Sequence, residues 1–190
     1  MKYKCFMEDN IVLDDIKEIL ISEEQITKKV EELGAKITAD YKNKNLLMVS
    51  ILKGSVVFMA DLMRQIKLPH RIDFMAVSSY GTGVKSSGVV KITKDLDILL
   101  EGYDLLIVED ILDSGLTLHY IIDILKSRKP KSIAVCTLLD KPECRKVEVK
   151  TEYSGFSIPD KFVVGYGLDY SEKYRNLPFI GILKPEIYSK

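Results

Sequence analysis

The side chains of this 190-residue chain that could do chemistry gather in one short segment, directly after an apolar run over residues 105–108. Glu109 and Asp110 come first. Two adjacent carboxylates that end a buried strand repel each other and lose hydration, so they need a cation or hydroxyl donors. Ribose hydroxyls and Mg²⁺, a hard cation that prefers oxygen ligands, would meet both needs, and a phosphate-rich substrate would bring the metal with it.

A turn follows these acids and leads into a helical pattern. It contains Asp113 and then Gly115, which lies between the hydroxyls of Ser114 and Thr117. The unpaired backbone amides and the positive dipole end of a helix start favour a bound phosphate. Each feature alone is more often only a helix cap. In this order after a buried strand, they indicate a site in which sugar, metal and phosphate lie in one row.

Apolar patterns show which elements must position these residues. Ser22 with Gln25 is a capping-box pattern that opens a helix ending near Tyr41. Helices are also expected over residues 56–66 and 116–126, and strands over residues 46–52, 72–77, 103–108 and 132–139. The continuous apolar runs favour strands buried on both faces of a parallel sheet, joined by right-handed crossovers. Residues 78–88 predict a long loop, and a loop of that length is usually functional.

The composition is that of one ordinary globular domain. Lys and Arg number 28 and so do Asp and Glu, which disfavours a dedicated nucleic-acid binder. No apolar run reaches the ~20 residues that span a bilayer, and no export signal is visible. The cysteines Cys5, Cys136 and Cys144 match neither a zinc site nor a redox pair, so we expect reduced thiols in a cytoplasmic protein.

Residues 108–117 resemble the phosphoribosyl pyrophosphate signature of the type I phosphoribosyltransferases. Other segments are similar to the hypoxanthine-guanine branch of that family: residues 52–55 to its pyrophosphate loop, 78–81 to the start of its mobile lid, and 141, 158–166 and 168–170 to its purine-binding hood. The likeness covers nearly the whole chain. It implies an α/β fold with a twisted, mainly parallel sheet flanked by helices. The single domain would span residues 1–190, with a core of about 22–140 and a small hood built mainly from 141–190 and the N-terminal segment.

The resemblance implies a role for each residue around the transferred sugar. Asp113 would be the catalytic residue, taking a proton from a purine imidazole ring or holding it by a hydrogen bond. Glu109 and Asp110 would face the ribose hydroxyls and Mg²⁺. The 5′-phosphate would be held by Ser114, Gly115, Leu116 and Thr117, although mammalian members carry Lys at the position of Leu116. The pyrophosphate would be held by Lys53, Gly54 and Arg175, with a turn at Lys53 that the family usually makes through a cis peptide.

For the base, the resemblance implies selectivity for 6-oxopurines over adenine. Lys141 would donate to the exocyclic oxygen, Phe162 would stack on the ring, and the Val163 backbone would meet the opposite edge. Asp169 would lie near that edge and bind a second Mg²⁺.

A mobile lid and an assembly are implied as well. Ser79 and Tyr80 would close over the reacting centre and exclude water. The partners would be phosphoribosyl pyrophosphate and the base, with Mg²⁺ as cofactor. A homodimer or homotetramer is the expected assembly, and neither nucleic acid nor a membrane is involved.

Other interpretations stay open. A regulator could keep this fold to sense a nucleotide and bind RNA or DNA, but it should show a basic face. A receiver-like module would carry its acids after the first strand rather than past mid-chain. Xanthine is the nearest rival base. Structurally, Lys141 could be a surface lysine, Phe162 a core aromatic and Arg175 an ion-pair partner of Glu172.

Overall fold

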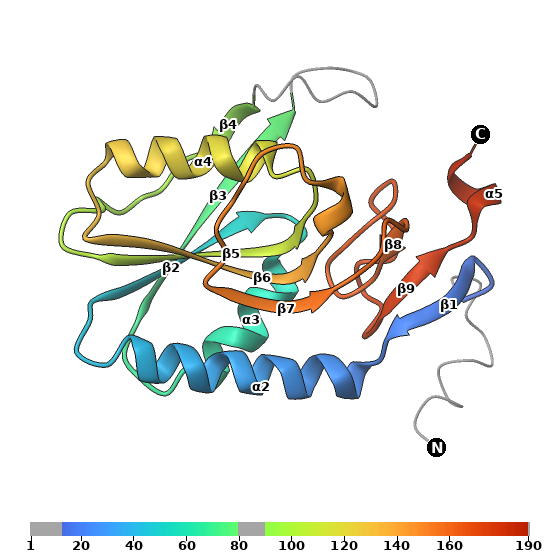
Figure 1. Ribbon diagram of the computed structural model, residues 1–190, viewed down its shortest axis with the longest axis horizontal. Helices are drawn as coiled ribbons and strands as arrows, with labels where there is room; N and C mark the ends of the chain where they lie inside the picture. Colours follow the sequence, from blue (N-terminus) through green and yellow to red (C-terminus); the bar gives the residue numbers. More distant parts are fainter. Residues whose placement is uncertain (1–12, 80–89, 190) are drawn as a thin grey trace.

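The chain forms two β-sheets of unequal size, which a computed structural model describes for residues 13–79 and 90–189 (Figure 1). Within these residues, the larger sheet has the strand order β4 (Val90–Lys94), β3 (Arg71–Ser79), β2 (Leu46–Leu52), β5 (Asp104–Leu112), β6 (Ser132–Asp140) and β7 (Tyr153–Ser157). The smaller sheet has the order β1 (Ile16–Ile21), β9 (Ile180–Leu183) and β8 (Val163–Val164). The helices are α2 (Glu23–Asp40), α3 (Val56–Gln65), α4 (Leu116–Ser127) and α5 (Pro185–Tyr188), and a 3₁₀ turn, η1, lies at Pro142–Cys144.

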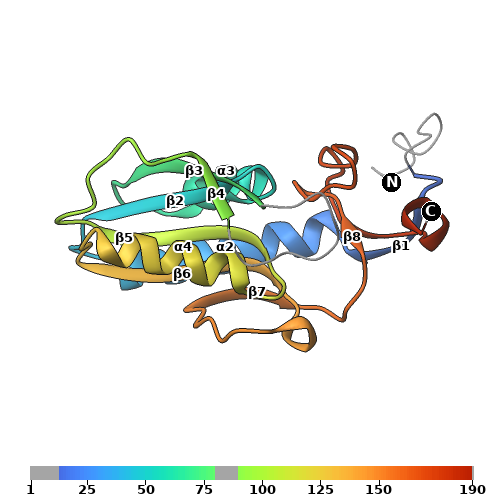
Figure 2. The ribbon, with the colours of Figure 1, turned by 90° about the horizontal axis from the view of Figure 1, so that it is seen from above.

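The larger sheet is mainly parallel and lies between helices. All of its neighbouring strands pair in parallel except β4, which pairs with β3 in the antiparallel sense. Helix α3 connects β2 to β3, and α4 connects β5 to β6. Helices α2 and α3 cover one face and α4 covers the other (Figure 1 and Figure 2). The expected α/β class is therefore confirmed.

Strand β2 is buried on both faces, which explains its continuous apolar run. Leu46 and Met48 belong to the core cluster that includes α2 and α3, whereas Leu47 and Val49 belong to the cluster that includes α4. All four side chains are at most 1% exposed. Apolar packing on both faces thus holds the central strands in place. The loops that follow these strands therefore start from a rigid edge of the sheet.

The helix boundaries agree closely with the sequence patterns. The capping box of α2 is confirmed, because the Gln25 amide donates to Ser22 Oγ at 3.3 Å and the Ser22 amide donates to Gln25 Oε1 at 2.8 Å. Helices α3 and α4 begin at the expected residues, Val56 and Leu116. These helices therefore follow from local signals alone.

Strand β5 extends beyond its expected end. We expected it to stop at residue 108, but it continues to Leu112, which pairs with Asp140 of β6. Cross-strand pairing therefore carries the strand through two acids that local propensity would exclude. As a result, Glu109 and Asp110 lie inside a paired strand rather than after it.

Other strands also differ from expectation. Ser78 and Ser79, which we assigned to the long loop, belong to β3. The rest of that loop, including the lid residue Tyr80, lies outside the described residues, as does the side chain of Ser79. Strands β1, β4, β7, β8 and β9 were not expected. All of them except β9 lie at a sheet edge, and β1 exposes three successive residues, so a continuous apolar run does not mark it.

The smaller sheet stands at one end of the larger sheet (Figure 1). Strand β9 lies in its centre and pairs antiparallel with both β1 and β8. Residues near the two ends of the chain thus build it together. We expected the hood to begin near residue 141, but β7 still pairs with β6 in the larger sheet. The division of the domain into residues 22–140 and 141–190 remains a prediction.

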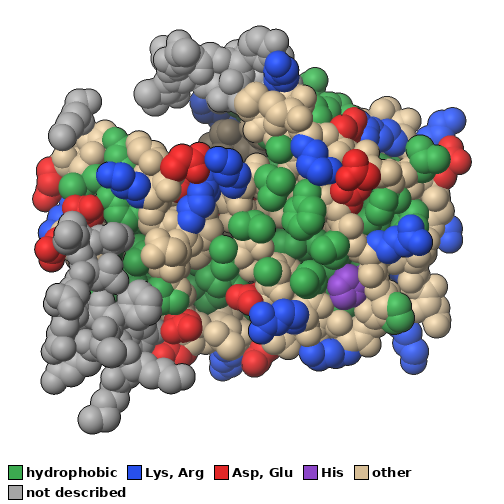
Figure 3. Space-filling model, turned by 180° about the vertical axis from the view of Figure 1, so that it is seen from behind, with side chains coloured by type: hydrophobic (Ala, Val, Ile, Leu, Met, Phe, Trp, Pro, Cys, Tyr) green, Lys and Arg blue, Asp and Glu red, His purple; other side chains and the backbone are tan. Residues whose placement is uncertain are grey.

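The surface carries both signs of charge. Figure 3 shows hydrophobic side chains near the middle of one face, with Lys and Arg interspersed with Asp and Glu around them. The described residues of this face therefore do not form the basic patch that a nucleic-acid regulator would need. In the described part of the chain, no helix combines the length and apolar character needed to cross a membrane.

Candidate active site

The loops after three neighbouring strands meet at one edge of the larger sheet. Strands β2, β5 and β6 are parallel neighbours, so their carboxyl ends point the same way. Lys53 follows β2, Asp113 follows β5 and Lys141 follows β6. Ligands of open parallel sheets bind at this end of the strands. The predicted pyrophosphate, catalytic and base residues are thus brought to one edge.

A cavity of about 180 Å³ lies at the turn after β5. It is lined by Glu109, Asp110, Ile111, Leu112, Asp113, Ser114, Gly115, Thr117 and Leu118. The predicted phosphate and ribose residues therefore share one cavity, with the exception of Leu116. Leu116 is the first residue of α4, and its backbone amide lies 3.5 Å from the Ser114 hydroxyl in the turn.

Gly115 is required at the start of α4. It has a φ of +81° and is the N-cap residue. A Cβ at this position would lie 2.9 Å from the Val147 carbonyl oxygen, too close for any other side chain. The Lys146 amide donates to the Ser114 carbonyl at 2.9 Å. The segment after η1 thus supports the phosphate turn from outside the cavity.

Glu109 and Asp110 are partly buried acids whose carboxylates have few hydrogen-bond partners. Oε2 of Glu109 is buried and has no hydrogen-bond partner among the described residues. Burial, and then the neighbouring Asp110, raise the pKa of Glu109 well above its ordinary value. Burial raises the pKa of Asp110 to about 6, although the Ile111 amide donates to it at 2.8 Å and acts in the opposite direction. Such acids gain from a ligand that brings a cation or hydroxyl donors.

Two loops, at Gly54 and Gly167, meet each other and the side chain of Asp110 on β5. A Cβ on Gly54 would lie 1.7 Å from Oδ2 of Asp110, and a Cβ on Gly167 would lie 2.0 Å from the Gly54 carbonyl oxygen. Gly167 also has a φ of +101°. Only glycine fits at position 167, and any other residue at position 54 would displace the Asp110 carboxylate. The peptide between Leu52 and Lys53 is cis, which is the isomer that the resemblance implied.

Ion pairs join the pyrophosphate loop to the hood. Nη2 of Arg175 lies 2.8 Å from Oδ1 of Asp169 and 3.3 Å from Oε2 of Glu172. Nζ of Lys53 lies 3.0 Å from Oε1 of Glu172, and Lys53 and Arg175 together lower the pKa of Glu172. Nη1 of Arg175 donates to the Gly167 carbonyl at 2.8 Å. The ion pair between Arg175 and Glu172 that the sequence left open is therefore present. The same arginine also binds the Gly167 carbonyl and so holds the turn that touches the pyrophosphate loop.

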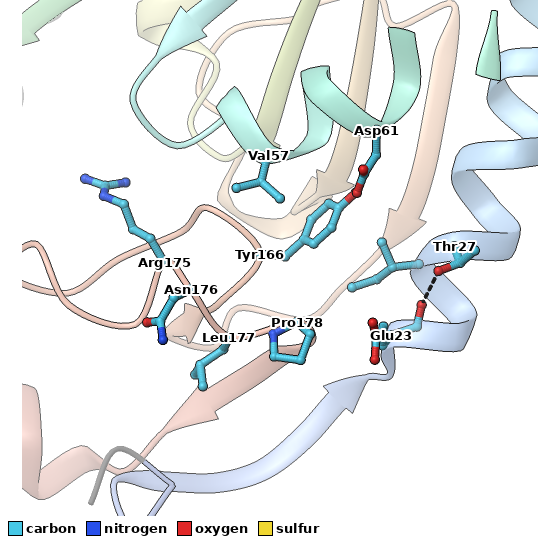
Figure 4. A pocket seen from close by; sticks show the side chains of 10 residues that line it. Glu23, Thr27, Val57, Asp61, Tyr166, Arg175, Asn176, Leu177 and Pro178 are labelled. Carbon is cyan, nitrogen blue, oxygen red and sulfur yellow. Dashed lines mark hydrogen bonds between the residues drawn. The ribbon is translucent and has the colours of Figure 1, made fainter. Parts of the chain in front are cut away.

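A hydroxyl fastens this hood turn to α3. Figure 4 shows Tyr166 pointing toward Asp61, and the Tyr166 hydroxyl donates to Asp61 Oδ2 at 2.7 Å. The two residues border a second cavity, of about 270 Å³. Burial, and then Asp61, raise the pKa of Tyr166, so the hydroxyl stays protonated and donates. This bond holds the adjacent Gly167 in place.

Lys141 is only 7% exposed, which excludes the surface-lysine interpretation. Its ammonium lies 3.4 Å from Oδ1 of Asp160, and its amide donates to the Leu112 carbonyl at 2.9 Å. Burial, and then the neighbouring acids Asp160 and Asp113, raise the pKa of the Cys144 thiol to about 11. Asp160, the ion-pair partner of Lys141, and the exposed Asp113 therefore both act on this thiol.

Phe162 is 37% exposed, so it is not a core aromatic. It directly precedes β8, in which Val163 pairs with Ile182. Its ring lies at 88° to the ring of Tyr170, with centres 5.6 Å apart. Because Tyr170 follows Asp169, three of the residues predicted for the base, Phe162, Val163 and Asp169, lie in one part of the hood.

Several site residues were not singled out for function from the sequence. Glu172, Gly167 and Asp160 all make the contacts described above, yet none was assigned a role. Lys53 and Glu172 are 119 positions apart, so no local pattern signals their contact. Asp160 lies inside the hood segment that carries the resemblance, and that segment was the one available signal.

Comparison with known proteins agrees with this geometry. Residues 17–171 match the family model described as phosphoribosyl transferase domain. The chain is 57% identical over 174 residues to the hypoxanthine-guanine phosphoribosyltransferase of Bacillus subtilis, which covers 92% of this chain and 97% of that protein. It is also 55% identical over 177 residues to the bifunctional protein TilS/HprT of Listeria monocytogenes; this match covers 93% of this chain but only 27% of that longer protein.

Solved structures agree as well. A crystal structure of a hypoxanthine phosphoribosyltransferase from Staphylococcus aureus matches with a TM-score of 0.93 at 52% identity, covering 96% of this chain and 100% of that one. A hypoxanthine phosphoribosyl transferase from Trypanosoma cruzi matches with a TM-score of 0.88 at 41% identity, covering 93% and 95%. The chain therefore belongs to the phosphoribosyl transferase family and has its type I fold.

Proposed function

We propose that this chain is a purine salvage enzyme that transfers the 5-phosphoribosyl group from phosphoribosyl pyrophosphate to hypoxanthine and guanine. The products are IMP or GMP and pyrophosphate. The observation that carries the proposal is that Leu112 joins two parts of the site. Leu112 lines the phosphate cavity, and its carbonyl accepts a hydrogen bond from the backbone amide of the buried Lys141 at 2.9 Å. A phosphate site and a buried ammonium donor for a base are thereby adjacent. The names of the relatives support the same activity.

Asp113 supplies the acid–base step. As a nitrogen of the purine imidazole ring bonds to the anomeric carbon, the bond from that carbon to pyrophosphate breaks. The proton that the imidazole ring must lose passes to the Asp113 carboxylate or is held by it through a hydrogen bond. Asp113 lines the cavity and is exposed, so a bound base can reach it. A general base of this kind contributes about 10²–10⁴-fold to the rate.

The phosphate turn and the basic side chains position the sugar. Backbone amides at the start of α4 and the hydroxyls of Ser114 and Thr117 bind the 5′-phosphate. Lys53, the Gly54 loop and Arg175 bind pyrophosphate. Glu109 and Asp110 accept hydrogen bonds from the ribose hydroxyls. The developing positive charge on the anomeric carbon is stabilised by these carboxylates, which the fold holds ready before the reaction.

The acid pair fits Mg²⁺. Its donor set is hard carboxylate oxygen, and one of these oxygens, Oε2 of Glu109, is buried and unpartnered among the described residues. No group of three or more His, Cys, Asp or Glu in the described part of the chain could hold a metal by itself. That suits an ion held by one or two carboxylates and the substrate phosphates, with Glu109 and Asp110 as its protein ligands. When bound, the ion neutralises the pyrophosphate leaving group.

Asp169 is the proposed ligand of a second Mg²⁺. In the described structure, one of its oxygens lies 2.8 Å from Nη2 of Arg175 and the other accepts the Glu172 amide at 2.9 Å. Ion pairing with Arg175 therefore competes with a metal at this carboxylate.

Lys141 selects the base. Its ammonium is a donor only, so it pairs with the exocyclic oxygen of a 6-oxopurine and opposes the amino group of adenine. Phe162 stacks on the ring, and the Val163 backbone meets the opposite edge. Because these contacts do not read position 2 directly, xanthine remains the alternative base.

The proposal is tested by incubating the protein with phosphoribosyl pyrophosphate, Mg²⁺ and either hypoxanthine, guanine, xanthine or adenine. Each reaction has a control with a chelator. We expect chelator-sensitive nucleotide formation from hypoxanthine and guanine and none from adenine. Product from xanthine alone would establish the xanthine alternative. Absence of product from every base, with nucleotide binding intact, would favour the regulator.

The lid formed by Ser79 and Tyr80, the homodimer or homotetramer and the cytoplasmic location remain predictions. Sedimentation of the purified protein measures the assembly directly.

A further inference from the structure

A stack of aromatic rings reaches from the C-terminal helix to the proposed base site. Tyr188, the last residue of α5, has its ring centre 4.7 Å from that of Phe162, and the two ring planes are 19° apart. This geometry is a stacked pair, and it differs from the perpendicular contact that Tyr170 makes with the same ring. None of the sequence motifs includes Tyr188.

Tyr188 is held in place by the strand that precedes it. The Leu183 amide at the end of β9 donates to the Phe162 carbonyl at 3.0 Å. This bond ties the end of β9 to the residue that precedes β8. One residue later, the Lys184 amide donates to the Asp15 carbonyl at 2.9 Å. Tyr188 itself packs against the small apolar cluster that contains Leu183. Helix α5 is thus anchored to the strand pair that carries Phe162.

Phe162 keeps accessible surface despite these neighbours. The residue is 37% exposed although Tyr188 stacks on its ring. A base needs one open face for stacking, and a stacked neighbour on the other face restricts the rotation of the side chain. The arrangement therefore prepares one face of the ring for a planar ligand.

We propose that Tyr188 is a positioning residue for the base, because it stacks on one face of Phe162 and holds the other face toward the purine. This inference rests on the proposed function, in which Phe162 is the ring that stacks on the base. Tyr188 acts on the base through Phe162 and not on the phosphate turn. Its removal should therefore change the KM for hypoxanthine and leave the KM for phosphoribosyl pyrophosphate unchanged.

The test compares four variants of the full chain: Tyr188→Phe, Tyr188→Leu, Phe162→Leu and, as the matched control on the same helix, Glu186→Ala. Glu186 is exposed and is not a partner in the ring pair of Phe162 and Tyr188. For each variant, kcat and the KM values for hypoxanthine and phosphoribosyl pyrophosphate are measured. Thermal unfolding reports whether each variant folds, and Tyr188→Leu keeps apolar bulk so that α5 stays packed.

We expect Tyr188→Leu to raise the KM for hypoxanthine roughly three- to tenfold, the range that an aromatic pair supports, with the other KM within about twofold. Tyr188→Phe and Glu186→Ala should match the parent protein. An unchanged or lower hypoxanthine KM in Tyr188→Leu, with a raised KM in Phe162→Leu, overturns the role of Tyr188 alone. An unchanged KM in Phe162→Leu, in a protein that still makes nucleotide, overturns the stacking role of Phe162 and this inference with it. Absence of nucleotide in the parent protein would instead count against the proposed function.

Discussion

The two halves of the site are held in different ways. The phosphate half lies on β5 and the start of α4, where strand pairing and two apolar cores fix the backbone. The base half lies in the hood, where the chain turns through positive φ angles at Gly165, Tyr166, Gly167, Ser171, Glu172 and Tyr174. Ion pairs and side-chain hydrogen bonds hold these turns in addition to a small apolar cluster of their own. The comparison teaches that regular structure presents the phosphate site, whereas contacts between distant segments assemble the base site.

The largest effect is expected in the phosphate half, where a single carboxylate performs the acid–base step. Asp113→Asn keeps the shape of the side chain but removes its basicity. We expect kcat to fall about 10²–10⁴-fold, with both KM values within a few fold. Steady-state kinetics measure both quantities.

A matched control for this variant is Asp123→Asn, an exposed acid on α4. It should leave kcat unchanged. Undiminished turnover in Asp113→Asn would remove Asp113 from the catalytic role.

A smaller effect is expected where the two halves touch. Gly167→Ala would place a Cβ 2.0 Å from the Gly54 carbonyl oxygen, so the hood turn or the pyrophosphate loop must move. We expect kcat/KM for phosphoribosyl pyrophosphate to fall about tenfold or more, because misplaced binding groups lose catalytic alignment.

Gly102→Ala is the control for backbone strain. Gly102 also has a positive φ, +84°, but a Cβ there would meet nothing within 4 Å. This variant should lose about 1 kcal/mol of stability, as expected for a non-glycine residue in this region, and keep its activity. Equal activity losses in the two variants would show that the contact between the halves is unimportant.

The same comparison explains what the sequence could predict. Helices α2, α3 and α4 and the central strands follow from apolar periodicity and a capping box, which are local signals. The turn before α4 and the start of this helix were predicted, because the glycine, hydroxyls and acid are contiguous in the chain; phosphate binding at this turn remains a prediction. The predicted end of β5, at residue 108, was wrong, because pairing with β6 extends the strand to Leu112. In the hood, the contacts of Lys53 with Glu172 and of Phe162 with Tyr188 depend on folding, and no spacing rule signals them.

The smallest effect concerns the buried acid pair. Burial raises the pKa of Asp110 from its ordinary 3.8 to about 6, so the folded protein binds this proton more tightly than the unfolded chain does. The resulting stability is present below the unfolded pKa and is lost as the pH rises through about 6. Asp110→Asn, which resembles the protonated acid, should therefore unfold at the same temperature as the parent near pH 4. Near pH 7.5 it should unfold several degrees higher.

Thermal unfolding of the ligand-free proteins across this pH range measures the difference. Glu143→Gln, at an exposed position in η1, serves as control and should follow the parent protein at every pH. A constant difference between Asp110→Asn and the parent from pH 4 to pH 7.5 would show that burial of this carboxylate has no energetic consequence.

The central claim is that the larger sheet binds the phosphoribosyl half of the reaction and the hood side binds the base. The most direct measurement is the pair of KM values in Thr117→Ala and Lys141→Gln, with Lys146→Gln as an exposed lysine control. We expect Thr117→Ala to raise only the KM for phosphoribosyl pyrophosphate, and Lys141→Gln to raise only the KM for hypoxanthine. Each rise should be about tenfold or more, the loss expected for a hydrogen bond that involves a charged partner. If both variants raised both KM values equally, or if the two effects were exchanged, the assignment of the two halves would be contradicted.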